Sequence, residues 1–134
     1  MTISSNWTHI FSDKVFSSFV LTGSKYFNDP EFEAGGTGFS RNNVIYDYSL
    51  KTDIEYLPNE KHNFAVGFWS GTFTLKLKDY FDGTNTFNER LHNRYGSFYV
   101  QDTWRPTEKW KILGGVRANY FSDGQYVRIE PRLS

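Results

Sequence analysis

The fold is decided by a stretch of alternating polarity that runs over residues 43–56, with the sequence NVIYDYSLKTDIEY. Its even positions are apolar or aromatic, with Thr52 as the exception, and its odd positions are polar, with Ile45 as the exception. Successive side chains of a β-strand point to opposite faces, so this period predicts a strand with one apolar and one polar face. The stretch is also longer than the roughly five or six residues of a typical strand.

The same alternation recurs on both sides of this stretch. It predicts further strands over residues 3–10, 15–27, 63–79, 95–105, 109–121 and 126–134. Short turns separate them at residues 11–14, 57–62 and 105–109, and longer polar loops that contain glycine separate them at 28–42 and 82–93. The last connection, residues 122–125, is short and is an exception to this contrast. We therefore expect an all-β fold, an antiparallel up-and-down meander of about seven long strands that pair in sequence order.

Two details depart from regular alternation. Within residues 63–79 the large side chains change from even to odd positions near Gly67 and Gly71, and we expect a β-bulge there. Asp102 lies on the otherwise apolar side of residues 95–105.

Composition excludes several classes of protein. The chain has 134 residues with 13 Phe, 9 Tyr and 4 Trp, an aromatic content that a disordered tail lacks. Its longest apolar run, residues 64–69, is far shorter than the roughly 20 residues of a membrane-spanning helix. Fifteen basic and fifteen acidic residues cancel, which argues against a nucleic-acid partner. The absence of cysteine excludes disulfides and thiolate chemistry.

Alternation alone fits two environments, because the apolar face can line the interior of a soluble barrel or contact lipid. Long strands and the contrast between short turns and long loops favour a transmembrane barrel. Aromatic residues also gather near the strand ends, where we expect them at the membrane–water interface. These interface residues are Trp7, Tyr56, Trp104, Trp110 and Tyr120.

One segment carries a more specific likeness. Residues 97–106, SFYVQDTWRP, resemble the signature of TonB-dependent outer-membrane receptors in which Tyr-Val-Gln-Asp-x-Trp precedes a short periplasmic turn. Residues 110–120 and 130–134 resemble the strands that follow it. The resemblance spans essentially the whole chain. It implies a bacterial outer-membrane transporter for a scarce, bulky nutrient of the siderophore, cobalamin or glycan class, with no chemistry on the substrate, no enzymatic activity and no cofactor.

The chain also departs from that family. Such receptors combine a plug domain with a barrel of about 22 strands, whereas residues 1–134 have no plug, no signal peptide and a last strand that stops at Ser134. We therefore expect a single, incomplete domain, an internal segment of the barrel. The resemblance implies outer-membrane lipid, the receptor's own plug, the TonB complex and the nutrient as partners.

Two groups of charged residues are candidate contact sites. We expect the first to line the lumen and face the plug or the ligand, although a purely structural charge ladder is the alternative: Arg117, Arg128, Glu130 and Arg132. The second makes the first long loop acidic, either as an extracellular contact surface or as an ordinary solvated loop: Asp29, Glu31 and Glu33. The three histidines are scattered, so we expect no metal site.

Two other functions stay open at this point. A soluble β-barrel that binds a small apolar ligand is the main alternative, because 134 residues suit that class. An outer-membrane hydrolase would need a nucleophile, a base and an orienting group close together, and the three distant histidines do not supply such a set.

Overall fold

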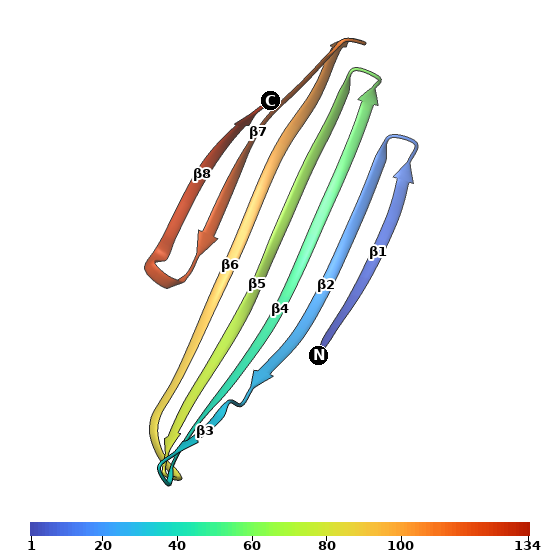
Figure 1. Cartoon of the computed structure of the whole chain (residues 1–134). Coiled ribbons are helices and arrows are strands. Elements are labelled where there is room, and N and C mark those ends of the chain that lie inside the picture. Colours follow the sequence, from blue (N-terminus) through green and yellow to red (C-terminus); the bar gives the residue numbers. More distant parts are fainter.

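The chain forms one antiparallel sheet in the computed structural model, which describes residues 1–134 apart from the side chain of Ala34 (Figure 1). The strands are β1 (Thr2–Ser12), β2 (Val15–Asn28), β3 (Glu31–Ala34), β4 (Thr37–Asn59), β5 (His62–Phe81), β6 (Thr84–Thr107), β7 (Trp110–Phe121) and β8 (Tyr126–Leu133), with a 3-10 turn, η1 (Asp123–Gln125), before β8. Their order in the sheet is β1-β2-β4-β5-β6-β7-β8, and β3 pairs with β4. The predicted all-β antiparallel meander is therefore confirmed, with eight strands.

The two predicted long loops are wrong, because both segments are largely strand. The β3–β4 hairpin turns at Gly35 and Gly36, and the β5–β6 hairpin turns at Asp82 and Gly83. All four residues have positive φ, between 49° and 80°. Two-residue hairpin turns favour this conformation because it matches the right-handed twist of the strands that they join. Polar hairpin arms of this kind pair with each other and need no buried face.

Three strands are much longer than the others and protrude together. β4, β5 and β6 have 23, 20 and 24 residues, and at the lower end of Figure 1 they extend past β1 and β8 as a ribbon. The three short turns all lie at the opposite end, as predicted. One end of the sheet therefore has tight turns, and the other has the two long hairpins and the short β7–β8 connection.

The predicted bulge in β5 is also wrong. β5 keeps a continuous register with β4 from Phe64 to Phe81, and its pairing with β6 is unbroken through Gly67 and Gly71. The large side chains instead change face, from Phe68 on one side of β5 to Trp69 on the other. The glycines serve a different purpose, described below.

The cross-strand register defines two faces, because directly opposed residues point to the same side. One row crosses all seven strands of the main path: Trp7, Phe19, Thr52, Phe68, Phe98, Ala118 and Ile129. The next row on that side contains Ile54, Val66, Val100, Val116 and Pro131. We call this side the belt face and its apolar residues the belt. The opposite side, which carries Asp47, Asp53, Tyr99 and Arg117, is the polar face.

The sheet buries almost none of its apolar surface. Among the described residues the only buried hydrophobic side chain is Ala65, whereas Trp7 is 56% exposed and Ile129 is 69% exposed. A single sheet has nothing to pack its apolar face against, and stable domains pair such a face with a second layer. A large continuous exposed belt indicates contact with another apolar phase or partner. No helix in the described part of the chain is long and apolar enough to cross a membrane.

Candidate functional site

The polar face carries two tyrosines that bridge across a strand. Tyr99 of β6 donates its hydroxyl hydrogen to Asp53 Oδ1 of β4 at 2.7 Å, and Tyr95 donates to Asp47 Oδ2 at 3.0 Å. β5 lies between β4 and β6, so each ring must pass over β5 to reach its carboxylate. Hydrogen bonds to ionised acceptors are stronger than neutral ones. These two bonds therefore tie together three strands rather than two.

Glycines in β5 make this crossing possible. Gly67 lies directly opposite Tyr99, and Gly71 lies directly opposite Tyr95. A Cβ atom at Gly67 would overlap the Tyr99 ring, and one at Gly71 would lie 2.5 Å from the Tyr95 hydroxyl. Strand glycines often mark such close approaches, where an aromatic ring covers the bare backbone. The two tyrosine rings therefore pack against the bare backbone at the two glycines.

Arg117 extends this network from β7. Its guanidinium carbon lies 5.5 Å from the centroid of the Tyr99 ring, and its Nε is buried without a hydrogen-bond partner. Lys51 forms an ion pair with Asp53 at 2.9 Å, so a tyrosine, two cations and a carboxylate surround one small hollow of about 120 Å³. Buried donors are nearly always satisfied in folded proteins. The Nε of Arg117 is thus an unpaired buried donor within this network.

A larger hollow lies next to it, with aromatic walls. Its volume is about 580 Å³, and its lining includes Asp47, Trp69, Phe73, Tyr95, Asn119, Phe121 and Tyr126. The Trp69 and Tyr95 rings lie 4.7 Å apart, and Phe73 and Phe121 lie 6.1 Å apart. Flat apolar surfaces beside a carboxylate and an amide can hold a partly polar ligand or a neighbouring protein segment.

The four predicted lumen residues all lie on the polar face of β7 and β8. Arg128 and Glu130 form an ion pair at 3.0 Å, which is what a structural ladder contains. Arg132 lies opposite Gly115, and Arg117 lies opposite Glu130 but turns to the Tyr99 ring. The geometry thus separates Arg117 from the other three. Its role in contacting a plug or ligand stays a prediction.

The predicted acidic loop is a hairpin arm. Asp29 precedes β3 and accepts a hydrogen bond from the Asn42 side chain at 2.7 Å, while Glu31 and Glu33 belong to β3 itself and are exposed. The loop assignment was wrong for the reason given above, and the contact role of these residues stays a prediction.

The predicted interface aromatics lie on one face of the sheet but at different positions along the strands. Trp7, Tyr56, Trp104 and Tyr120 lie on the belt face, and Trp110 opens β7 in phase with Ile112. Trp7 lies in the row of Phe68, whereas Trp104 lies near the short turns, opposite His62. His62 also explains why Asp102 is found on the otherwise apolar side of β6, because Asp102 Oδ2 lies 2.7 Å from His62 Nδ1.

Sequence patterns did not reveal the tyrosine–carboxylate network. Alternation places Asp47 and Asp53 on the polar side of β4, but it does not say which residues of β6 lie beside them. Two glycines and two tyrosines with the same four-residue spacing are the only signal, and it becomes informative once β5 and β6 are aligned.

Neither a metal site among the described residues nor a similar known protein gives further evidence of function. Among the described residues, no group of three His, Cys, Asp or Glu side chains is arranged to hold a metal ion. Comparisons with protein-family models, curated proteins and solved structures find no match to the chain. The functional argument therefore depends on the two faces of the sheet.

An ion pair in the protruding ribbon predicts a pH effect. Arg41 donates two hydrogen bonds to Asp79, at 2.7 and 2.8 Å, between β4 and β5. These hydrogen bonds, and then the positive charge, hold the pKa of the Asp79 carboxyl below its usual value. A lowered carboxyl pKa means that the ion pair stabilises the ribbon above the usual Asp range, and that this stabilisation is lost as the pH falls through the lowered pKa.

We expect hydrogen-exchange protection of the β4 and β5 backbone amides around this ion pair to fall on acidification in the wild type and to depend less on pH in Asp79→Asn. Protection factors, corrected for the intrinsic exchange rate, measure this. An unchanged acid dependence in Asp79→Asn would show that another group controls the ribbon.

Proposed function

We propose that this chain is a section of the barrel wall of a TonB-dependent outer-membrane receptor, with the belt face toward lipid and the polar face toward the lumen. The observation that carries the proposal is the belt itself. One of its rows crosses all seven strands with Thr52 as its only polar member, the next is apolar on five strands, and most of its large side chains are exposed. Three of the four ion pairs and both tyrosine–carboxylate bonds lie on the other side. Apolar-out and polar-in alternation is the arrangement of transmembrane barrels.

The outline of the sheet supports the same assignment. A tilted strand crosses a bilayer with about 9–11 residues, and β4, β5 and β6 have at least 20 each. The excess emerges at the long-hairpin end, as extracellular hairpins do in outer-membrane barrels, and short turns occupy the periplasmic end. The segment from Tyr99 to Trp104, which carries the family resemblance, leads into the short β6–β7 turn, where that resemblance expects it.

The open edges of the sheet also fit a section of a larger wall. β1 pairs only with β2, and β8 pairs only with β7. Unpaired edges invite further strands, and a closed barrel supplies them. A soluble barrel with an apolar ligand cavity would instead enclose the belt, which the described sheet does not do.

The receptor function follows from the polar face. In the complete barrel the two hollows of the polar face lie toward the plug or the passing nutrient. The protein would bind and admit its nutrient without changing it, with energy from the TonB complex, in the bacterial outer membrane. The ligand class stays within siderophores, cobalamin and glycans.

Two tryptophans on opposite faces make a matched test. Trp7 lies on the belt face and Trp69 on the polar face, and their exposures are similar, at 56% and 45%. Variants that keep only one of these two tryptophans, with the others changed to Phe, are inserted into vesicles whose lipids carry brominated acyl chains. We expect strong quenching of Trp7 and weak quenching of Trp69, because only the belt face contacts lipid.

Other patterns of quenching contradict the proposal in distinct ways. Stronger quenching of Trp69 reverses the assignment of the faces. Equal quenching means that the sheet does not separate lipid from lumen. A protein that stays soluble and monomeric without lipid, with neither tryptophan quenched, is the soluble binding protein.

A further inference from the structure

Beyond the belt, toward the long hairpins, the belt face changes from apolar to basic. Six residues form this basic patch: Lys25, Lys76, Lys78, Arg90, His92 and Arg94. They occupy four consecutive rows of one face, since Lys25 shares a row with His92 through Tyr46 and Thr74, and Lys76 lies directly opposite Arg90. Three strands, β2, β5 and β6, therefore present basic residues on the same side.

None of these basic residues forms an ion pair among the described residues. One carboxylate borders the patch, because Asp29 accepts a hydrogen bond from Asn42, the residue opposite Lys78. On the belt face of β2, β4, β5, β6 and β7 the only carboxylate is Asp102, which lies near the short turns beside His62. Glu31 and Glu33 lie farther out on β3 and form no ion pair among the described residues either. Like charges directly opposed across a ladder, as in Lys76 and Arg90, destabilise a sheet. An external anion would remove that cost.

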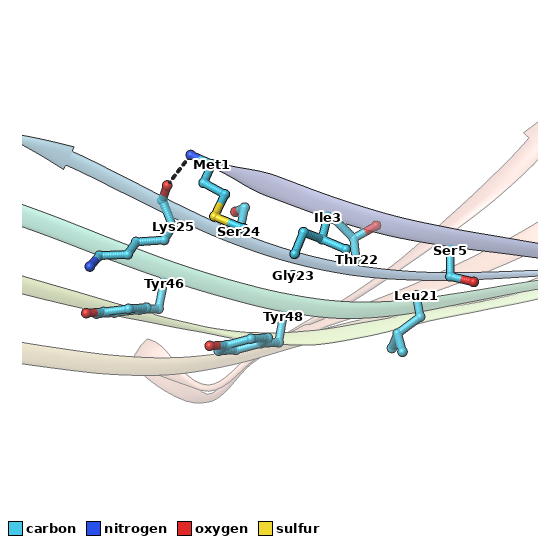
Figure 2. A pocket seen from close by; sticks show the side chains of 10 residues that line it. All are labelled: Met1, Ile3, Ser5, Leu21, Thr22, Gly23, Ser24, Lys25, Tyr46 and Tyr48. Carbon is cyan, nitrogen blue, oxygen red and sulfur yellow. Dashed lines mark hydrogen bonds between the residues drawn. The ribbon is translucent and has the colours of Figure 1, made fainter.

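An apolar groove leads into the basic patch. It has a volume of about 410 Å³ between β1, β2 and β4, and Ile3, Leu21, Tyr46 and Tyr48 line it (Figure 2). Lys25 lies beside Tyr46 at one end of the groove. The ammonium groups of Lys25 and Lys76 both lie over the Tyr46 ring, 5.5 and 5.4 Å from its centroid. An apolar channel that ends at two ammonium groups matches a molecule with an acyl chain and an anionic head.

We propose that the basic patch binds the phosphate headgroups of anionic lipids in the leaflet on the long-hairpin side. The inference rests on the proposed function only in taking the belt face as the lipid side. Tyr46 and Tyr48 of β4 lie in the rows of Lys25 and Arg94, and tyrosine is typical of the boundary between acyl chains and headgroups. Phosphates at that level meet Lys25, Lys76 and Arg90, while the acyl chains continue along the groove and the belt. Each basic residue near an anionic surface adds about fivefold in affinity.

Vesicles that differ only in charge test the proposal. The full chain is bound to phosphatidylcholine vesicles and to vesicles that also contain phosphatidylglycerol, at equal ionic strength. We expect tighter binding to the anionic vesicles. The double variant Lys76→Gln with Arg90→Gln should lose at least about tenfold of that preference. The matched control is Lys109→Gln with Lys111→Gln, which removes the same charge at the short-turn end and should keep most of the preference.

The outcomes separate this inference from the proposed function. Equal binding to both vesicles, or equal losses in the two double variants, overturns lipid recognition by the patch. In that case quenching of Trp7 in neutral vesicles still supports the barrel wall. If Trp7 is not quenched while the anionic preference persists, the patch binds a surface and the belt does not enter the bilayer. Circular dichroism on neutral vesicles confirms that each variant is folded.

Discussion

Val116→Arg is expected to reduce the free energy of unfolding from lipid vesicles by about 2–4 kcal/mol, and Asn119→Arg to change it far less. Val116 lies within the belt, in the row of Ile54, Val66 and Val100, and is 45% exposed. Asn119 lies three residues later in β7, on the polar face, opposite Ser97. The cost arises because an arginine on the belt face must leave water for the hydrocarbon, whereas one on the polar face stays in an aqueous lumen.

The same pair of variants distinguishes lipid from water as the environment of the belt. An arginine at a half-exposed position of a water-facing sheet costs little, so the described exposure alone predicts no large effect. Urea titration of the full-length receptor in vesicles measures both free energies. Equal destabilisation by the two substitutions would contradict the assignment of the faces. Destabilisation by Val116→Arg in a lipid-free, soluble protein would indicate that the belt is an interior core.

The meander was predictable from sequence wherever the two faces of a strand differ in polarity. Residues 43–56 and 109–121 have one apolar and one polar side, so their alternation is visible without any partner. The arms near residues 31–42 and 84–94 are polar on both sides, so alternation of polarity does not predict strands there. The turn residues Gly35-Gly36 and Asp82-Gly83 were the available signal, since such pairs favour two-residue hairpins.

The polar face was predictable only in part. Alternation alone places Arg117 and Glu130 on one side of neighbouring strands. The bond between Tyr99 and Asp53 joins residues 46 positions apart across an intervening strand, so it depends on two registers at once. The expected bulge failed for a related reason. A glycine in a strand marks either a bulge or a close approach, and only the neighbouring strand decides between them.

Gly67→Ala is the second substitution for which we expect a large effect, a loss of about 2–4 kcal/mol in the free energy of unfolding. The new Cβ would overlap carbons of the Tyr99 ring, and overpacking of this kind costs about 1–3 kcal/mol. Displacing the ring also breaks the hydrogen bond to Asp53, and bonds to charged groups contribute about 1.5–3 kcal/mol. Gly114→Ala is the control, because its Cβ would have no atom within 4 Å. Urea titration in vesicles should show a neutral or slightly stabilising effect for the control.

A double-mutant cycle tests whether the ring is the cause. The three atoms nearest to a Cβ at Gly67 all belong to Tyr99, so Gly67→Ala should cost much less in a Tyr99→Ala background. At Gly71 the Cβ would also meet the backbone oxygen of Tyr48 at 2.6 Å, a group that cannot move aside. Gly71→Ala should therefore remain costly in a Tyr95→Ala background. If removal of Tyr99 does not relieve Gly67→Ala, the ring does not lie on the glycine, and the three-strand bridge is absent in the membrane.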